Sequence, residues 1–264
     1  MKIGFIGCGN MATAMLKGIL KSGEVEASDM IASAKSDKTR EKIEKELSIR
    51  KADTNAQVVD FADVVFLAVK PQFLEGVLDE IRDSVKAGQI FISIAPGKTL
   101  QWLGERLGEN TKVIRTMPNT PAMVGEGMTA LCVNELVTEE ETALAVKLCN
   151  TFGKTEVIPE HLMDAVVGVS GSSPAYVFMF LEAMADAAVA DGMPRAQAYK
   201  FAAQSVLGSA KLMLETGKHP GELKDMVCSP AGTTIQAVRV LEEKGFRSAV
   251  IEAQTECVKK ARGM

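Results

Sequence analysis

The feature of this chain that most constrains its fold is a regular alternation of short apolar runs with helical patterns, which continues to about residue 158. This spacing is typical of βαβ units, and it predicts a mainly parallel sheet covered by helices. The run Val64 to Val69 has no polar alternation, as expected for a strand that is covered on both faces. We predict strands at residues 2–6, 29–33, 64–69, 90–94, 112–115, 129–133 and 155–158.

After Pro159 the strand signals stop, and proline and glycine residues instead mark the ends of helices. A chain of 264 residues also exceeds the usual size of a single core. We therefore predict a dinucleotide-binding domain at 1–158 and an all-α domain for substrate binding and dimerisation at 159–264. Helices are predicted at residues 174–192, 194–217, from 220 onward, at 232–245 and at 246–261.

The predicted helix that begins at Pro174 is apolar on nearly every face. Glu182 and Asp186 interrupt its apolar run, which favours a buried helix over a membrane span. A helix that is apolar all round must be covered all round, and a domain of roughly a hundred residues cannot easily enclose one. We therefore expect a second subunit to cover one side of it.

Composition excludes several classes of function. A net charge of -4 and an aromatic content of 5% argue against a nucleic-acid partner. The five cysteines are scattered and the two histidines lie far apart in sequence, so neither a disulfide framework nor a zinc site is predicted. Since the N-terminus has no secretory pattern, we expect the protein in a reducing cytoplasm.

A glycine-rich motif at the end of the first strand predicts a dinucleotide site. The sequence from Gly7 to Ala12 has the form G-x-G-x-x-A and leads directly into a helix. Gly7 permits a tight turn, Gly9 lets the backbone approach a pyrophosphate, and Ala12 permits close packing of helix on strand. With the strand before and the helix after, the motif indicates a Rossmann-like, doubly wound domain.

The end of the second strand indicates which dinucleotide is bound. An NAD site usually has an acidic residue there, whereas this chain has Ser33, Lys35 and Ser36. Hydroxyls and a cation favour a 2′-phosphate, so we predict NADPH, with NADH as a weaker alternative. The alternative for Lys35 is an ordinary exposed lysine.

Two more strand ends meet the same edge of the sheet, and both are followed by proline. Asn55 is either a contact to the adenine side or a helix N-cap, and the sequence alone favours the cap. The predicted cofactor-binding residues are Ile6, Gly7, Cys8, Gly9, Asn10, Met11, Ser33, Lys35, Ser36, Asn55, Ala68, Val69, Lys70, Pro71, Ala95, Pro96 and Asn119.

Three further segments narrow the range of families that the chain can resemble. They are 117–121 (Met-Pro-Asn-Thr-Pro), 171–176 (Gly-Ser-Ser-Pro-Ala-Tyr) and 229–237. With the opening glycine motif, they make the whole chain resemble the pyrroline-5-carboxylate reductases. That family reduces L-1-pyrroline-5-carboxylate to L-proline, the last step of proline biosynthesis, with hydride from NAD(P)H to the C=N carbon. The resemblance also implies a homodimer, and a ring of dimers beyond it.

The resemblance assigns the substrate carboxylate to the turn before the helix at residue 233. By themselves, Thr233 and Thr234 are ordinary helix-start residues, but a helix N-terminus also suits a small anion. The resemblance implies that Ser229, Gly232, Thr233 and Thr234 bind the carboxylate, with Thr234 as a catalytic candidate. Glu160 matches a family glutamate near the imine, and it is the second catalytic candidate.

The chain departs from the family pattern at two places. Family members commonly have Gly-Gly-Ala-Thr where this chain has Ala-Gly-Thr-Thr at 231–234, and Ala-Ala-Gly where it has Ala-Pro-Gly at 95–97. Thr233 adds a methyl group and a hydroxyl near the carboxylate, and Pro96 removes an N–H donor. These changes bear on affinity and hydrogen bonding rather than on the fold.

The expected chemistry needs little from the protein beyond orientation, because the cofactor carries the hydride and the ring nitrogen can take its proton from water. Two alternatives stay open. A β-hydroxyacid dehydrogenase would need a catalytic lysine near residues 168–176, where none occurs. A non-catalytic NADPH-binding redox sensor would not need the carboxylate site.

Overall fold

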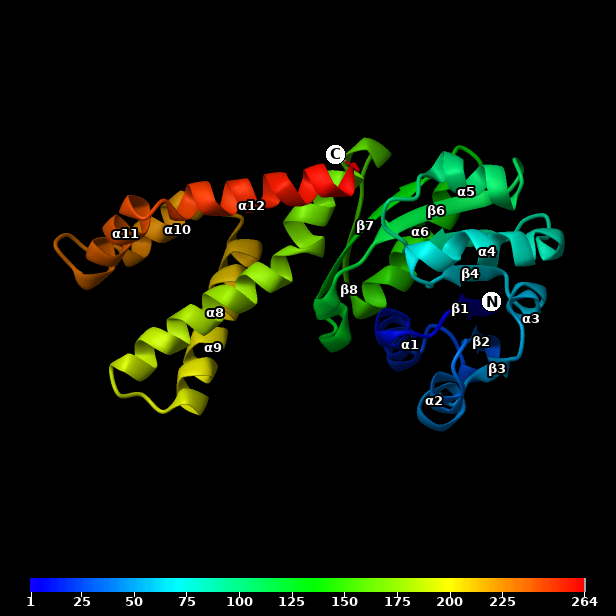
Figure 1. The fold of residues 1–264 in the computed structure, drawn as a ribbon, viewed down its shortest axis with the longest axis horizontal. Coiled ribbons are helices and arrows are strands. Elements are labelled where there is room, and N and C mark those ends of the chain that lie inside the picture. Colours follow the sequence, from blue (N-terminus) through cyan, green and yellow to red (C-terminus); the bar gives the residue numbers. More distant parts are fainter. Residues whose placement is uncertain (264) are drawn as a thin grey trace. The chain divides into compact units, whose positions relative to one another are not determined.

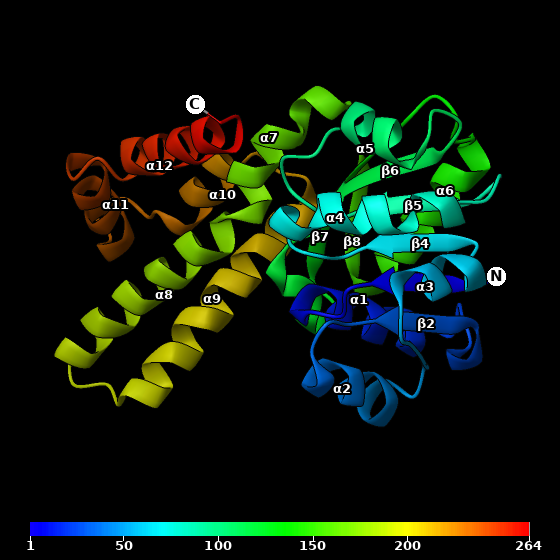
Figure 2. The same ribbon diagram turned by 45° about the vertical axis from the view of Figure 1, so that its right-hand side comes forward.

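The computed structural model describes residues 1–263, apart from the side chain of Lys42. Within these residues one eight-stranded sheet has the order β3-β2-β1-β4-β5-β6-β7-β8 (Figures 1 and 2). The strands are β1 Ile3–Ile6, β2 Met30–Ser33, β3 Arg50–Ala52, β4 Val64–Leu67, β5 Ile90–Ser93, β6 Lys112–Met117, β7 Gly127–Val133 and β8 Gly153–Val157.

The helices of this part of the chain cover both faces of the sheet. They are α1 Asn10–Ser22, α2 Asp37–Leu47, α3 Asn55–Phe61, α4 Pro71–Ile81, α5 Leu100–Leu107, α6 Glu139–Cys149 and α7 Met163–Val166. Ile3 and Phe5 face a core with α1, α2 and α6. Ile6 faces a second core with α3, α4 and α5. This alternation along β1 is the two-residue period of a strand buried on both faces.

The strand prediction is confirmed at seven places, with ends that move by one or two residues. It missed β3, an edge strand of three residues in which Arg50 and Lys51 are exposed. Edge strands carry charges that discourage pairing with other chains, so their sequences lack the apolar signal.

The pairing of β6 with β7 is antiparallel, in an otherwise parallel sheet. The connection at residues 118–126 holds only the short helix η3 (Thr120–Val124). A parallel crossover needs about a dozen residues or more, so a connection this short must return as an antiparallel neighbour. The mainly parallel, doubly wound sheet is confirmed.

The chain forms two compact units, and each is described by itself. Unit 1 comprises residues 1–172 and 258–264, and unit 2 comprises residues 173–257. The helical second half is confirmed: α8 Ser173–Ala190, α9 Arg195–Thr216, α10 Pro220–Val227, α11 Thr233–Glu243 and α12 Phe246–Ala261. Gly192, Gly217 and Gly245 have positive φ after three of these helices, as glycine stop signals require.

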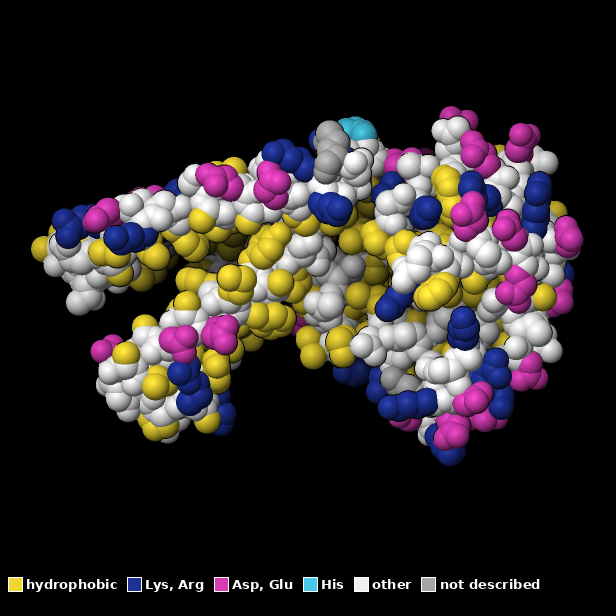
Figure 3. All heavy atoms as spheres, viewed as in Figure 1, with side chains coloured by type: hydrophobic (Ala, Val, Ile, Leu, Met, Phe, Trp, Pro, Cys, Tyr) yellow, Lys and Arg dark blue, Asp and Glu magenta, His cyan; other side chains and the backbone are white. Residues whose placement is uncertain are grey.

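Unit 2 exposes most of its apolar side chains in the single chain (Figure 3). Of the residues of unit 2, only Ala185, Ala198 and Ala202 are buried. By length and composition the segment Glu160–Ala190 could cross a membrane, and 6% of its most apolar window is buried. The burial predicted for α8 is therefore not achieved within one chain.

Candidate active site

The sheet order places a crevice at one edge of unit 1. β1 lies between β2 and β4, so the chain order reverses there, and the carboxyl ends of these parallel strands point to the same edge. Ligands of open α/β sheets bind at this kind of reversal. Four of the loops predicted to bind a cofactor follow the parallel strands β1, β2, β4 and β5 and therefore meet at that edge.

The glycine motif has the backbone geometry that the sequence predicted. Gly7 has a φ of 92°, and a Cβ there would lie 2.8 Å from the carbonyl oxygen of Ala68. A Cβ at Gly9 would meet nothing within 4 Å. Gly9 is the N-cap of α1, no side chain caps that helix, and its first turn has no acidic residue. The open space outside Gly9 and the uncapped N–H groups fit a pyrophosphate.

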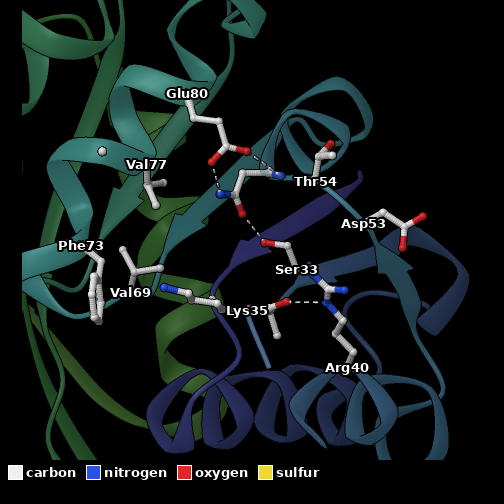
Figure 4. Close-up of a pocket in the computed structure, with 13 residues that line it drawn as sticks. Ser33, Lys35, Arg40, Asp53, Thr54, Val69, Phe73, Val77 and Glu80 are labelled. Atoms are coloured by element: carbon white, nitrogen blue, oxygen red, sulfur yellow. Dashed lines mark hydrogen bonds between the residues drawn. The ribbon is translucent and has the colours of Figure 1, made fainter. Parts of the chain in front are cut away.

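A pocket of about 410 Å³ lies beside this turn (Figure 4). It brings together predicted residues from four elements or loops. Its lining comprises Gly7, Ser33, Ala34, Lys35, Arg40, Asp53, Thr54, Asn55, Val69, Phe73, Gly76, Val77 and Glu80.

Two cations border the pocket. The Lys35 ammonium lies 5.5 Å from the centre of the Phe73 ring. The Arg40 Nε donates to the carbonyl oxygen of Ala34 at 2.8 Å. The Arg40 Nη1 atom, at the outer end of the guanidinium, lies 3.7 Å from Asp37 Oδ1. Arg40 was not predicted. Its position, four residues after Ser36 on the first turns of α2, is the signal that could have indicated it.

Ser33, Asn55 and Glu80 form one hydrogen-bonded chain across the pocket. The Ser33 hydroxyl donates to Asn55 Oδ1 at 2.7 Å, and Asn55 Nδ2 donates to Glu80 Oε2 at 2.7 Å. Thr54, not Asn55, caps α3, so the preference for Asn55 as a cap is wrong. Asn55 is the first helical residue, and its side chain is free to bond across the pocket.

Four pocket residues on α4 were also missed: Phe73, Gly76, Val77 and Glu80. Their spacing of three, one and three places them on one helical face. That face was visible in the sequence, but only the tertiary structure shows that it lines an open pocket beside the end of the second strand.

Several predicted residues lie at the sheet edge but outside this pocket. Cys8, Gly9 and Asn10 border a neighbouring hollow of about 500 Å³ next to α2. Ser36 is the N-cap of α2, where its hydroxyl accepts from the Thr39 N–H at 3.3 Å.

Lys70 is the N-cap residue of α4, which begins at Pro71 and has no side-chain cap. Ala95 is buried, and its N–H donates to the Ser93 hydroxyl at 3.3 Å. Pro96 is exposed beside Gly97, whose φ is 73°. Ile6 is the last residue of β1, Met11 lies in the first turn of α1, and Ala68 follows β4.

Asn119 and Glu160 each make internal bonds within unit 1. Asn119 Nδ2 donates to the carbonyl oxygen of Ser170 at 3.0 Å, and its Oδ1 accepts from the Met128 N–H at 2.8 Å. Glu160 Oε1 accepts from the Leu100 N–H at 2.7 Å and from Arg115 at 3.1 Å. Arg115 is buried, so this ion pair holds the strand β6, the start of α5 and the segment at 160 together.

The turn before α11, in unit 2, has the features of an anion site. Gly232 is the N-cap of this helix of eleven residues, and no side chain caps its N–H groups. Within the described residues of unit 2, the hydroxyls of Ser229, Thr233 and Thr234 have no protein partner, and Ser229 and Thr233 are exposed. Uncapped N–H groups and unengaged hydroxyls suit a small carboxylate.

Backbone strain marks the same turn. Ala231 has a φ of 57°, a conformation that L-residues other than glycine, asparagine and aspartate rarely adopt. A Cβ at Gly232 would lie 2.3 Å from the Ser229 hydroxyl. A side chain at position 232 would displace the Ser229 hydroxyl and crowd the Ser229 carbonyl oxygen at 3.2 Å, so glycine keeps this turn open. The glycine that the family commonly has at position 231 is explained by the angle.

Two of the buried thiols of unit 1, Cys132 and Cys149, are not nucleophiles. Burial raises the pKa of Cys149 to about 12. Burial, with the nearby Glu160 carboxylate, raises the pKa of Cys132 to about 12. Both thiols stay protonated near neutral pH, which agrees with a site that works without covalent catalysis.

Comparison with known proteins identifies the family. Residues 160–264 match pyrroline-5-carboxylate reductase dimerisation domains, and residues 2–97 match a family described as NADP oxidoreductase coenzyme F420-dependent. The pyrroline-5-carboxylate reductase of Escherichia coli K12 is 56% identical over 98% of this chain and 97% of its own length. The chain therefore belongs to the pyrroline-5-carboxylate reductase family.

Solved structures of the family have the same fold. The enzyme from Coxiella burnetii gives a TM-score of 0.93 at 33% identity, covering 99% of this chain and 97% of that one. The enzyme from Plasmodium falciparum, solved with NADP bound, gives 0.90 at 28% identity, covering 100% and 97%.

Membership confirms the resemblance, the Rossmann-like fold class and the enzyme class. The chain is an oxidoreductase that reduces pyrroline-5-carboxylate to proline with a nicotinamide cofactor. Both alternatives, a β-hydroxyacid dehydrogenase and a non-catalytic sensor, are thereby set aside. The helical half carries the dimerisation domain of the family, which accounts for the exposed apolar side chains of unit 2.

Proposed function

We propose that the enzyme prefers NADPH to NADH and that the pocket beside Gly7 holds the adenosine end of the cofactor. Lys35 and Arg40 border that pocket, and no acidic residue ends β2. These cations attract a 2′-phosphate, and the guanidinium can also bond to it through two N–H groups. The pyrophosphate lies over Gly9 at the uncapped start of α1.

The loops after β4 and β5 flank the nicotinamide ribose in this proposal. Ala68, Val69, Lys70 and Pro71 supply one wall, and Ala95 and Pro96 supply the other. Asn119 contributes by holding the adjoining wall in place, because both polar ends of its side chain are already bonded within the protein. The cofactor supplies the hydride when it is bound.

The substrate carboxylate is held by the turn before α11. The observation that carries this assignment is the uncapped N-terminus at Gly232, with hydroxyls of Ser229, Thr233 and Thr234 beside it. The helix dipole and these donors fix the ring by its acid group, which limits the orientations of the reacting carbon. Thr234 is the proposed catalytic contact.

Glu160 has a more limited part in the proposal than the resemblance implied. One of its oxygens is bound by Arg115 and by the Leu100 N–H. The other oxygen is left to accept a proton or a hydrogen bond at the imine nitrogen. Because the ring nitrogen can also exchange its proton with water, no strong protein acid is required.

Exchange of Lys35 tests the cofactor proposal. Lys35→Glu reverses one charge at the pocket, and we expect the ratio of kcat/KM for NADPH to that for NADH to fall about tenfold or more. Lys21→Glu, the same change in the last turn of α1, is the control and is expected to keep the ratio. A Lys35→Glu enzyme with the original ratio would contradict the proposal.

A crystal soaked with proline and NADP⁺ tests the substrate site. The proline carboxylate is expected on the N–H groups and hydroxyls of residues 232–234. A carboxylate bound elsewhere would overturn the assignment of Ser229, Gly232, Thr233 and Thr234.

The proposal includes the assembly and its surroundings. A homodimer covers the apolar surface of unit 2, in preference to a membrane, and dimers join into a ring. We retain a division into a cofactor-binding domain at 1–158 and a substrate-binding and dimerisation domain at 159–264. The scattered cysteines suit a cytoplasmic location, and the net charge of -4 gives no support to a nucleic-acid partner.

A further inference from the structure

The hydrogen-bonded chain of Ser33, Asn55 and Glu80 crosses the pocket where the proposed function places the adenosine ribose, and the inference rests on that placement. Its members come from β2, the first turn of α3 and the last turn of α4. Glu80 contacts Asn55 twice, since Oε1 also accepts from the Asn55 backbone N–H at 3.4 Å. In Figure 4 the labelled Glu80 and Ser33 side chains stand at the two ends of this chain.

The carboxylate at one end fixes the direction of every bond in the chain. An ionised carboxylate only accepts hydrogen bonds, so the Asn55 group that faces Glu80 must be the donating NH₂. The carbonyl oxygen of Asn55 then faces Ser33, and Ser33 must donate its hydroxyl proton to it. What Ser33 offers to a ligand is therefore its lone pairs.

A hydrogen-bond acceptor at this place distinguishes between the two cofactors. The ribose 2′-hydroxyl of NADH can donate to Ser33, whereas the 2′-phosphate of NADPH is itself an acceptor and carries negative charge. The Glu80 carboxylate adds a negative charge to the same pocket. Lys35 and Arg40 act in the opposite direction, because they attract the phosphate.

The pocket's other carboxylate does not belong to the chain. Asp53 lines the pocket, but its side chain points away from Ser33 and Glu80 in Figure 4. Its backbone N–H bonds to Gln57 at 2.8 Å. Glu80 is thus the acidic group that sets the polarity of the chain.

We propose that Glu80 is a specificity-determining positioning residue, which limits the preference for NADPH by turning Ser33 into an acceptor for a ribose hydroxyl. It touches neither the substrate nor the reacting atoms. Its effect reaches the cofactor through Asn55 and Ser33 and through its charge.

Glu80→Gln tests the proposal, because it removes the charge and the fixed polarity with almost no change in size. We expect the ratio of kcat/KM for NADPH to that for NADH to rise about five- to tenfold. We also expect adenosine 2′,5′-bisphosphate to gain affinity relative to 5′-AMP by a similar factor in titration calorimetry. Glu75→Gln, on the same helix but paired with Arg106 outside the pocket, is the control and is expected to leave both ratios unchanged.

Ser33→Ala tests the other end of the hydrogen-bonded chain. It is the variant to measure if Glu80→Gln folds poorly. It removes the acceptor, so 5′-AMP and NADH are expected to lose several-fold more affinity than their 2′-phosphorylated counterparts. An unchanged ratio in these variants, or an equal loss for both cofactors, would overturn the role of Glu80.

The Lys35→Glu experiment separates this inference from the proposed function. If Lys35→Glu lowers the NADPH to NADH ratio and Glu80→Gln leaves it unchanged, only the inference fails. If neither substitution alters the ratio, the adenosine end lies elsewhere and both fail.

Discussion

The two compact units of this chain use apolar residues in opposite ways. Unit 1 encloses them on both faces of a sheet, where side chains such as Phe5, Phe66 and Phe152 are fully buried. Unit 2 leaves Phe178 65% and Leu214 84% exposed. The difference teaches that unit 1 completes its core with its own chain, whereas the helices of unit 2 require the apolar surface of a second copy.

The largest expected effect comes from placing a charge on this surface. Phe178→Glu puts a carboxylate where the dimer would exclude water, at a cost of several kcal/mol for each subunit. We expect monomers in light scattering and loss of most activity. Leu136→Glu, at an apolar side chain of unit 1 that is 41% exposed, is the control and should stay dimeric. A dimeric Phe178→Glu protein would contradict the inference that a second copy covers this surface of unit 2.

The next prediction concerns the separate roles proposed for the two units, cofactor binding in unit 1 and substrate binding in unit 2. Thr234→Ala is expected to lower kcat/KM for pyrroline-5-carboxylate by about 1 to 3 kcal/mol of transition-state stabilisation, since a polar contact is lost. The dissociation constant of NADPH, measured by fluorescence titration, should not change.

Thr255→Ala is the matched control, because the Thr255 hydroxyl donates to the carbonyl oxygen of Ile251 within α12. Its kinetics should equal those of the unchanged enzyme. Equal kcat/KM values for Thr234→Ala and the unchanged enzyme would remove Thr234 from the site.

A third prediction uses the closed core of unit 1. Burial raises the pKa of Cys149 from 9.0 to about 12, so the folded chain keeps a proton that the unfolded chain releases. The contribution of this protonated thiol to the free energy of unfolding is complete below pH 9 and is lost as the pH rises towards 12. Between these two values the free energy of unfolding falls by about 1.4 kcal/mol per pH unit.

Urea unfolding at pH 8, 9 and 10 measures this slope. Cys149→Ala is expected to lower stability at every pH but to flatten the decline above pH 9. A variant with the slope of the unchanged protein would show that the thiol is ionised alike in both states.

The smallest expected effect is relief of strain at the anion turn. Ala231→Gly removes a Cβ from a residue with a φ of 57°, and we expect a gain of about 0.5 to 1 kcal/mol after the greater freedom of the unfolded chain is offset. Ser48→Gly at the end of α2, where φ is 56°, is the control in unit 1.

Both variants should raise the melting temperature, but only Ala231→Gly should change KM for pyrroline-5-carboxylate. An identical KM in both would show that the angle at residue 231 does not influence the carboxylate site.

The parts of the site that were predictable from the sequence are those set by local backbone geometry. Gly7 and Gly9, the uncapped start of α1 and the turn at Gly232 follow from glycine spacing and helix punctuation. Arg40, Phe73 and Glu80 were missed because their approach to Ser33 depends on how α2 and α4 pack on the sheet. The partners of Asn119 and Glu160 lie far away in sequence, which is why their internal bonds could not be foreseen.

By itself the sequence determined the succession of strands and helices apart from the edge strand β3, the cofactor motif and the requirement that α8 be covered by another surface. Each of these depends on periodicity and on neighbours within a few residues. Tertiary structure alone decided the antiparallel return of β7 and the closed chain from Ser33 to Glu80. Those features join residues that are distant along the chain, and their bonds form only when packing fixes both partners in direction as well as in distance.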